Sequence, residues 1–564
     1  MDYKISGTAL FGYLLLWYFC FNSSAFGQTS AITAEVEQKM AYQDEISIEY
    51  MRDHLEFIAS DRMQGRNTGS KQLKQVSDYL AREYEHLGLK PAVGDTGYLQ
   101  PYELESTIVD SITFAISNKK QNKSLLHFTA KPGAKAPFVQ LFGGNKPMQG
   151  DIVFAGFGIN DPDHNVAHMG DMDLENKWVM VYENIPSVVD GDTLVNPSIN
   201  TRQRFQDIIM GKKAKGMIII GLSNDEFKQR SARQASTLGK ADNMRLAYRK
   251  QQSQPGWSYL VINNALAKKL LGLPPDYPLD KHRQHLQNNI SKFEPAELPH
   301  RASITNYTQT KAITAHNVAA IVEGSDPKLK NEFVIITAHH DHLGVGQPDS
   351  TGDAIYNGAD DDGSGTVALL NIAKALQAAQ EENNGPKRSV MLLHVSGEEK
   401  GLLGSRYYSD HPEKPIEQTI ANLNIDMIGR VDKRHEQSGN PNYVYIIGGD
   451  IISSGLDSLI TLGNQHSGNI TLSDRYNDLQ DPNQFYRRSD HWNFGRLGVP
   501  FAFFFSGVHE DYHQPSDEIA KIQFEKMSRI VRTIYGAAIM LTETAETPVV
   551  DNQAFIMTTK LQER

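Results

Sequence analysis

Metal-binding side chains follow four short apolar segments in the C-terminal half of the chain. Each segment ends close to a histidine or a carboxylate: His339 after 333–338, Glu399 after 390–395, Asp426 after 421–425 and His513 after 499–505. A further carboxylate, Asp361, lies in the stretch NGADDDGSG at 357–365. One such residue alone is typical of a helix cap or a turn. Together they form the nitrogen and oxygen donor set that zinc accepts, so they predict a zinc site.

The stretch SGVHEDYHQPSD at 506–517 contains the letters of another zinc signature, HExxH. That signature needs both histidines on one face of a helix, one turn apart. Here Gln514 and Pro515 follow directly, and a residue before proline is disfavoured in helical geometry. We therefore predict that the match is accidental, that His513 belongs to the site, and that His509 and Glu510 do not bind metal.

Two other motifs argue against other enzyme classes. The sequence GSGTVA at 363–368 fits a loose dinucleotide fingerprint, but it follows three aspartates that would repel a pyrophosphate. The chain also lacks the G-x-S-x-G elbow of many serine hydrolases. Neither a dinucleotide enzyme nor such a hydrolase is therefore favoured.

The apolar segments alternate with amphipathic helical patterns from about residue 312 onward, as in NEFVIITA followed by GTVALLNIAKALQAAQ. This alternation predicts an α/β fold, a doubly wound mixed sheet with helices on both faces. In such sheets ligands bind at the carboxyl ends of the strands. The candidate ligands above all lie at or after such ends.

The rest of the chain differs in texture. A chain of 564 residues is too long for one compact core. Charged and apolar residues alternate at helical spacing over 30–92, whereas short β-rich runs such as DIVFAGFGI and GMIIIG follow later. We expect a signal peptide at 1–27, a helical lead-in of the catalytic domain at 28–124, a β-rich insert at 125–290, the catalytic domain at 291–545 and a tail at 546–564.

Composition limits partners and compartment. The formal charge is -11 with no basic block, which argues against a nucleic-acid partner. Lys4, an apolar run and Ala25-Phe26-Gly27 predict a signal peptide, hence a periplasmic or secreted protein with no stable membrane insertion. A retained signal anchor is the alternative, although the run is short for a span. Cleavage would remove Cys20, the only cysteine, and exclude disulfides and thiolate ligands.

Six motifs together resemble the di-zinc aminopeptidase family, which includes bacterial leucyl aminopeptidases, aminopeptidase Y and glutamate carboxypeptidase. They are HHD at 339–341, NGADDDGSG at 357–365, GEE at 397–399, NIDMIG at 424–429, YRRSDH at 486–491 and YHQPSD at 512–517. Their order and spacing match over about residues 315–545. The β-rich insert resembles, more loosely, the protease-associated (PA) domain that several exported members carry.

The resemblance implies two Zn²⁺ ions per chain and a role for each matched residue. His339 and Asp426 would bind one zinc, Glu399 and His513 the other, and Asp361 would bridge them. The remaining implied residues are Asp341, which orients His339, Glu398 as general base, and Tyr486 as the group that stabilises the oxyanion. A cis peptide bond after Asp361 is a further expectation from the family.

The implied function is an exported zinc aminopeptidase that removes N-terminal residues from peptides with a hydroxide that bridges the metals. A related carboxypeptidase or dipeptidase is an alternative, for which Arg487 and Arg488 could hold a substrate carboxylate. Glutaminyl cyclases share the ligand order but use one zinc and lack a large insert. A catalytically silent, metal-free binding protein is the alternative from another class. The sequence leaves side-chain preference and oligomeric state open.

Overall fold

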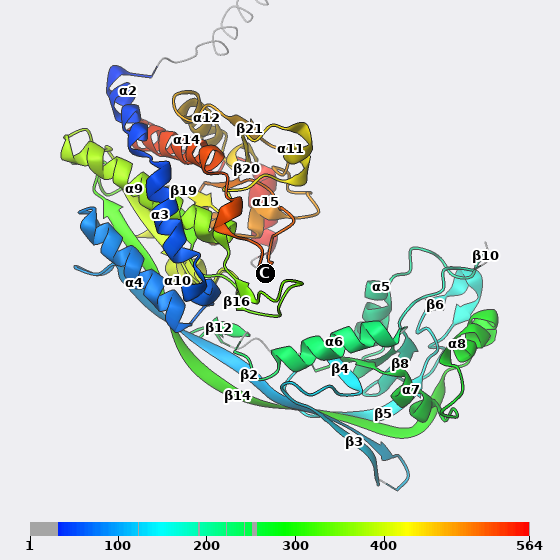
Figure 1. Cartoon of the computed structure of the whole chain (residues 1–564). Helices are drawn as coiled ribbons and strands as arrows, with labels where there is room; N and C mark the ends of the chain where they lie inside the picture. The colour runs from blue at the N-terminus through cyan, green and yellow to red at the C-terminus, as the bar shows by residue number, and fades with distance from the viewer. Residues whose placement is uncertain are drawn as a thin grey trace, which may run out of the picture. The chain divides into compact units, whose positions relative to one another are not determined.

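The structure is a computed structural model that describes residues 32–121, 123–189, 192–221, 223–241, 243–250 and 256–562 (Figure 1). It divides into two compact units, the first made of Met1–Pro101 with His316–Arg564 and the second of Tyr102–Ala315. The predicted signal peptide at 1–27, including Cys20, lies outside the described residues. Among the described helices, none has both the length and the apolar character of a membrane span.

The first unit contains a mixed sheet with the strand order β21-β20-β22-β19-β15-β18-β14. Strands β18, β15, β19 and β22 are parallel to one another. At the two ends of this group, β14 pairs antiparallel with β18 and β20 pairs antiparallel with β22. The bounds are β14 Ala296–Val322, β15 Phe333–His339, β18 Ser389–Val395, β19 Thr419–Ile425, β20 Tyr443–Gly448, β21 Thr471–Ser473 and β22 Phe501–Phe505. The predicted mixed α/β fold is confirmed.

Strand β15 shows why these segments form the centre of the sheet. Its sequence FVIITAH is β-branched and apolar, and every residue is buried. Register places Ile336 opposite Leu392 of β18 and Leu423 of β19. The parallel strands therefore end at one edge of the sheet.

Helices cover both faces of this sheet. Val334 and Ile336 of β15 pack into a core with α3 (Ile48–Ile58), α9 (Gly365–Glu381) and α14 (Phe524–Glu543). Ile335 points the other way and packs with Tyr408 of α10 (Leu403–Asp410) and Phe494 of α13 (His491–Gly495). Alternate side chains of a strand face opposite sides, so both faces of the sheet are covered.

The lead-in to the first unit is helical only in its first part. Helices α2 (Ala34–Met40), α3 and α4 (Lys71–His86) come first, and α3 and α4 begin at serine caps that accept from backbone N–H groups. From Leu99 the chain forms the long strand β2 (Leu99–Asn118), so the helices do not fill the predicted lead-in at 28–124. The other helices of this unit are α11 (Lys433–Ser438), α12 (Ser454–Gln465) and α15 (Gln553–Gln562).

The second unit has its own core and its own row of parallel strands. Its strand order is β14-β5-β8-β11-β13-β4, in which β5, β8, β11 and β13 are parallel. A core around Trp178, Ile218 and Phe114 belongs to this unit alone. The predicted insert at 125–290 lies within it. Its elements include β3 Ser124–Ala130, β4 Phe138–Gly143, β5 Met148–Phe154, β8 Trp178–Tyr182, β11 Gly216–Ile220, β12 Met244–Leu246, β13 Ser258–Ile262, α5 Thr201–Phe205, α6 Asn224–Thr237, α7 Asn264–Leu271 and α8 Leu279–Asn288.

Candidate metal centre

The five predicted metal ligands converge at the carboxyl edge of the first sheet. His339 Nε2 lies 3.2 Å from Asp361 Oδ1 and 3.7 Å from Asp426 Oδ1. On the other side of Asp361, its Oδ2 lies 3.2 Å from His513 Nε2, which is 3.4 Å from Glu399 Oε2. Asp361 thus stands between two donor groups, one on each of its oxygens.

His339 is held at the end of β15 by its neighbours. Its backbone N–H donates to Asp362 Oδ2 at 3.1 Å, and its carbonyl accepts from Thr366 Oγ1 at 2.7 Å. Its Nδ1 pairs with the backbone carbonyl of Asp341 at 3.1 Å, whereas the Asp341 carboxylate is 3.8 Å away. The predicted orienting carboxylate is therefore replaced by a carbonyl of the same residue.

The Asp341 carboxylate has another task in the structure. It accepts from Thr68 Oγ1 at 2.6 Å and from the backbone N–H of Glu398 at 3.2 Å. Burial raises the pKa of Asp341, although His339 opposes this. Asp341 therefore fixes the segment that carries Glu398.

The loop before α9 places Asp361 by several backbone contacts. The Asp361–Asp362 peptide bond is cis, which confirms the expectation from the family. The Asp517 carboxylate accepts from the N–H groups of Asp360 and Asp361 at 3.1 Å each. The buried Arg66 donates from Nη2 to the carbonyl of Gly358 at 2.7 Å and to that of Asp361 at 3.3 Å. Asp361 is thereby fixed at both of its backbone groups.

Asp362, next in sequence, is a rival for the first donor group, because its carboxylate also lies near His339 and Asp426. Both of its oxygens are already engaged, Oδ1 by the N–H groups of Gly365 at 2.9 Å and Met427 at 3.2 Å, and Oδ2 by that of His339. A carboxylate that satisfies three backbone donors is a structural group. These contacts leave Asp362 less suited than Asp361 to bind a cation beside His339 and Asp426.

Several buried carboxylates lie close together at this edge of the sheet, which favours the binding of cations. Burial, together with neighbouring carboxylates such as Glu399 and Asp490, raises the pKa of Glu398 well above its usual value. Burial likewise raises the pKa of Asp490 and, with the charge of Asp426, that of Asp362. So many buried carboxylates are stable as anions only beside positive charge.

Unpartnered buried atoms show where those cations fit. Within the described part of the chain, His339 Nε2, Glu399 Oε1 and both ring nitrogens of His342 have no hydrogen-bond partner. Buried polar atoms normally find one, so these atoms are suited to bind a group from outside the chain. Imidazole and carboxylate donors suit zinc. The residues present therefore fit the metal that the sequence predicted.

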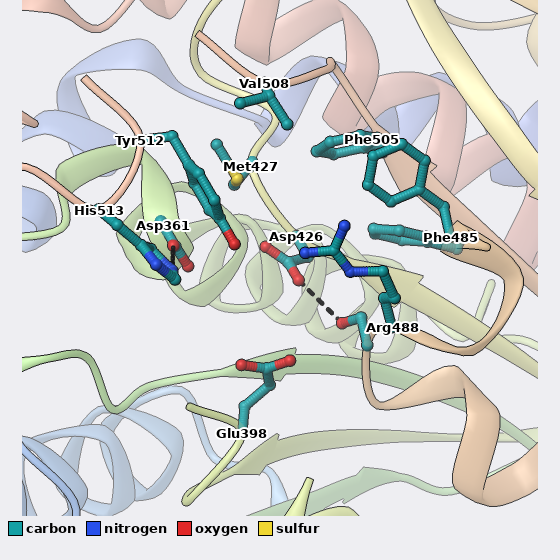
Figure 2. Close-up of a pocket in the computed structure, with 12 residues that line it drawn as sticks. Asp361, Glu398, Asp426, Met427, Phe485, Arg488, Phe505, Val508, Tyr512 and His513 are labelled. Carbon is teal, nitrogen blue, oxygen red and sulfur yellow. Dashed lines mark hydrogen bonds and ion pairs between the residues drawn. The ribbon is translucent and has the colours of Figure 1, made fainter. Parts of the chain in front are cut away.

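A pocket opens beside these residues (Figure 2). Figure 2 shows the Tyr512 hydroxyl pointing into the space between Asp361 and Asp426, with Glu398 facing the same space from the opposite side. Aromatic and aliphatic side chains form the other wall. The residues that line the pocket are Asp361, Glu398, Asp426, Met427, Phe485, Arg488, Ser489, Phe503, Phe505, Val508, Tyr512 and His513.

Tyr486 is not in this pocket, contrary to its predicted role at the oxyanion. It is 2 % exposed and packs in an aromatic cluster, with its ring 5.8 Å from that of Trp492. Tyr512, which sequence reasoning missed, presents its phenol to the site instead. Burial and the charges of Asp361 and Asp426 raise the pKa of Tyr512, so the phenol keeps its proton. The available signal was its position directly before His513.

The stretch with the letters HExxH forms turns rather than a helix, as predicted. His509 Nε2 lies 3.2 Å from Asp360 Oδ2, and Glu510 is exposed. His513 has a φ of 57° and directs its ring at Asp361 and Glu399. The two histidines thus serve different carboxylates.

Comparisons with known proteins agree with this geometry. Residues 317–538 match peptidase family M28. Leucine aminopeptidase 1 of Fusarium vanettenii is 29 % identical over 228 residues, 39 % of this chain and 54 % of that protein. Aminopeptidase YwaD of Bacillus subtilis is 28 % identical over 236 residues, 39 % of this chain and 44 % of that protein. The chain thus spans about half the length of these curated relatives.

One solved structure is similar in fold over most of the chain. The aminopeptidase from Aneurinibacillus sp. strain AM-1 superposes with a TM-score of 0.52 and 17 % identity, and the match covers 91 % of this chain and 98 % of that one. At this identity the likeness concerns the fold alone.

Proposed function

Because residues 317–538 match peptidase family M28, we propose that the protein is a zinc-dependent aminopeptidase that removes N-terminal residues from peptides. The observation that carries the proposal is the placement of Asp361, whose two oxygens face His339 on one side and His513 on the other. Names of relatives support the reaction, since Leucine aminopeptidase 1 and Aminopeptidase YwaD each match 39 % of the chain.

The chain supplies donors for two zinc ions. His339 and Asp426 would hold one, Glu399 and His513 the other, and Asp361 would belong to both. When bound, the ions would lower the pKa of the attacking water and polarise the peptide carbonyl.

Glu398 is the proposed proton carrier. Its carboxylate faces the pocket while its backbone N–H is fixed by Asp341 at 3.2 Å (Figure 2). A raised pKa suits a group that first takes a proton from water and later gives it to the leaving amine. Glu399, the next residue, faces His342 and His513 instead. Adjacent glutamates thus take different roles.

Tyr512 is the proposed donor to the oxyanion of the tetrahedral intermediate. Its hydroxyl points into the space that Glu398 faces, and burial with nearby carboxylates keeps it protonated. A phenol at this place can donate a hydrogen bond to the negative charge that develops on the carbonyl oxygen. This role replaces the one predicted for Tyr486.

The test uses the purified chain and aminoacyl chromogenic substrates with free and blocked N-termini. An aminopeptidase hydrolyses only the free series, loses activity with a chelator and regains it with Zn²⁺. Hydrolysis of the blocked series would contradict the proposal, and a chain that binds no zinc would favour the silent binding protein.

A second candidate, a carboxypeptidase or dipeptidase, rests on Arg488. This residue lines the pocket, with its guanidinium carbon 5.2 Å from the centroid of the Phe485 ring (Figure 2). A guanidinium at this place could bind a substrate carboxylate in two-point fashion. Dipeptides and their C-terminal amides separate the two activities, because only a carboxypeptidase-like enzyme requires the free carboxylate.

We also propose that the protein is exported. The apolar run and the Ala25-Phe26-Gly27 exit support a cleaved signal peptide. Mass determination of the mature N-terminus tests this, with Gln28 expected as the first residue.

A further inference from the structure

His342 is a fully buried imidazole beside the second donor group, and none of the roles above uses it. Its Nδ1 lies 2.8 Å from Glu399 Oε1 and 3.9 Å from Asp361 Oδ2. Its ring stands 5.9 Å from that of His513 at an angle of 67°. His342 thus approaches all three residues proposed to hold the second zinc.

The ring nitrogens of His342 have no hydrogen-bond partner among the described residues. The approach of Nδ1 to Glu399 Oε1 is short but lacks the angle of a hydrogen bond, and Oε1 has no other partner there either. Two buried polar atoms that lie side by side without bonding each other can both bind a third atom between them. A cation satisfies both at once.

A neighbouring histidine shows what a structural imidazole looks like in this segment. His340 is also buried, but its Nε2 pairs with Ser77 Oγ at 2.9 Å and its Nδ1 with the carbonyl of Val395 at 2.8 Å. Both of its ring nitrogens are therefore satisfied by protein groups. Two residues further on, His342 has none of these contacts.

The distances suit donors of one zinc ion. Bonds of ~2.0–2.2 Å at tetrahedral angles place neighbouring donor atoms roughly 3.3–3.6 Å apart. The measured separations of His342 Nδ1 from Glu399 and Asp361 lie on either side of that value. His342 Nδ1, Asp361 and Glu399 moreover all lie within 4.8 Å of one another.

The chain also fixes the position of the His342 ring. The backbone N–H of His342 donates to the carbonyl of Arg66 at 3.3 Å. The ring lies against Gly358, where an added Cβ would come within 2.5 Å of its Cδ2 atom. The absence of a side chain at 358 therefore leaves the ring room beside the carboxylates.

From these contacts we infer that His342 binds the second zinc as a fourth protein ligand, through Nδ1, together with Asp361, Glu399 and His513. The inference rests on the proposed zinc enzyme and deepens it. The second site then has two imidazoles and two carboxylates, whereas the first has His339, Asp361 and Asp426. We therefore expect the second site to hold its zinc more tightly.

Zinc content of three full-length proteins gives the first test: wild type, His342→Gln and the matched control His340→Gln. We expect wild type and His340→Gln to retain two zincs on dialysis, and His342→Gln to lose one with an affinity at least ~100-fold lower. Unfolding of the metal-free proteins shows whether His342→Gln folds like wild type. Retention of both zincs by His342→Gln would overturn the inference, whereas a wild type without zinc would overturn the proposed function instead.

A spectroscopic test addresses coordination itself. In a Cys20→Ser background the chain has no cysteine, so His342→Cys introduces a single thiol. A thiolate can reach the site because Nδ1 is the near ring nitrogen and a Zn–S bond of ~2.3 Å is longer than a Zn–N bond of ~2.0–2.1 Å. With Co²⁺ in place of zinc, we expect a thiolate-to-cobalt charge-transfer band in His342→Cys and none in His340→Cys. Without that band, and with full zinc retention in His342→Gln, His342 is not a ligand.

Discussion

In both units, polar residues follow the carboxyl ends of parallel strands. The two units differ in whether these residues find hydrogen-bond or ion-pair partners within the protein. In the second unit, Glu183 follows β8; its carboxylate lies 2.7 Å from Arg230 and its carbonyl accepts from Arg204 at 2.9 Å. Asn263 follows β13 and caps α7. Protein groups therefore engage the carboxylate of Glu183 and the side chain of Asn263.

At the edge of the first unit the corresponding residues lack such partners. His339 Nε2 and Glu399 Oε1 have no hydrogen bond within the described part of the chain, and several carboxylates crowd one another. Residues at the ends of parallel strands thus stabilise the fold in the second unit, whereas in the first unit they form the candidate metal centre. Unpartnered imidazole nitrogens and carboxylate oxygens that lie side by side, rather than strand ends as such, distinguish the candidate metal centre.

The largest effect that we predict is at the edge of the first unit, where the adjacent glutamates Glu398 and Glu399 take different roles in our proposal. Glu398→Gln should keep both zincs and reduce kcat by ~10²–10⁴-fold, because the proton carrier is lost while the metal ligands remain. Zinc analysis and steady-state kinetics measure both quantities. Glu399→Ala is the matched comparison and should lose zinc. A Glu398→Gln protein that sheds zinc, or turns over at the normal rate, would reverse the assignment.

Tyr512→Phe is expected to have the next largest effect. Removing one donor to the oxyanion should reduce kcat by ~10²–10³-fold with little change in zinc content. Tyr486→Phe is the control, because its ring packs against Trp492 outside the pocket. Equal losses of kcat in the two variants would contradict the assignment of the oxyanion role to Tyr512.

The sequence predicted that these side chains converge, because their positions at strand ends follow from the topology of the sheet. Parallel strands bring their carboxyl ends to one edge, so His339, Asp426 and His513 could be placed together from apolar segments alone. The helices on both faces followed from the alternation of strands and amphipathic segments for the same reason.

Three features were not predicted from the sequence, because they depend on loop conformation and local packing. Tyr512 lines the pocket from a turn in which the next residue, His513, has a φ of 57°, and no periodic pattern encodes such a turn. The role of Tyr486 followed from the resemblance to the family, yet its ring packs in an aromatic cluster outside the pocket. Likewise the long polar strand β2 (Leu99–Asn118) lies where a helical lead-in was expected.

A smaller effect is expected at Arg488, whose replacement should change substrate preference rather than the rate of the chemical step. Arg488→Gln should lower kcat/KM about tenfold for substrates that carry a carboxylate near the scissile bond, about the worth of one charge-assisted contact. Arg487→Gln is the control, since Arg487 is not among the pocket residues. Comparing Leu and Glu aminoacyl substrates, and dipeptides with their amides, locates the carboxylate. An unchanged ratio for every pair would remove Arg488 from specificity.

The smallest effect is predicted at the other edge of the comparison, in the second unit. Glu183 and Arg230 are about a quarter exposed, with side-chain exposures of 21 % and 27 %, so their ion pair is partly screened by solvent. Glu183→Gln should therefore lower the free energy of unfolding by about 1 kcal/mol or less. It should leave zinc content and kcat unchanged, because the glutamate at this strand end serves only protein groups. Denaturant unfolding, zinc analysis and kinetics on the same preparation measure the three quantities. A loss of zinc or of kcat in Glu183→Gln would show that the strand edge of the second unit also contributes to the chemistry, and the contrast between the two edges would fail.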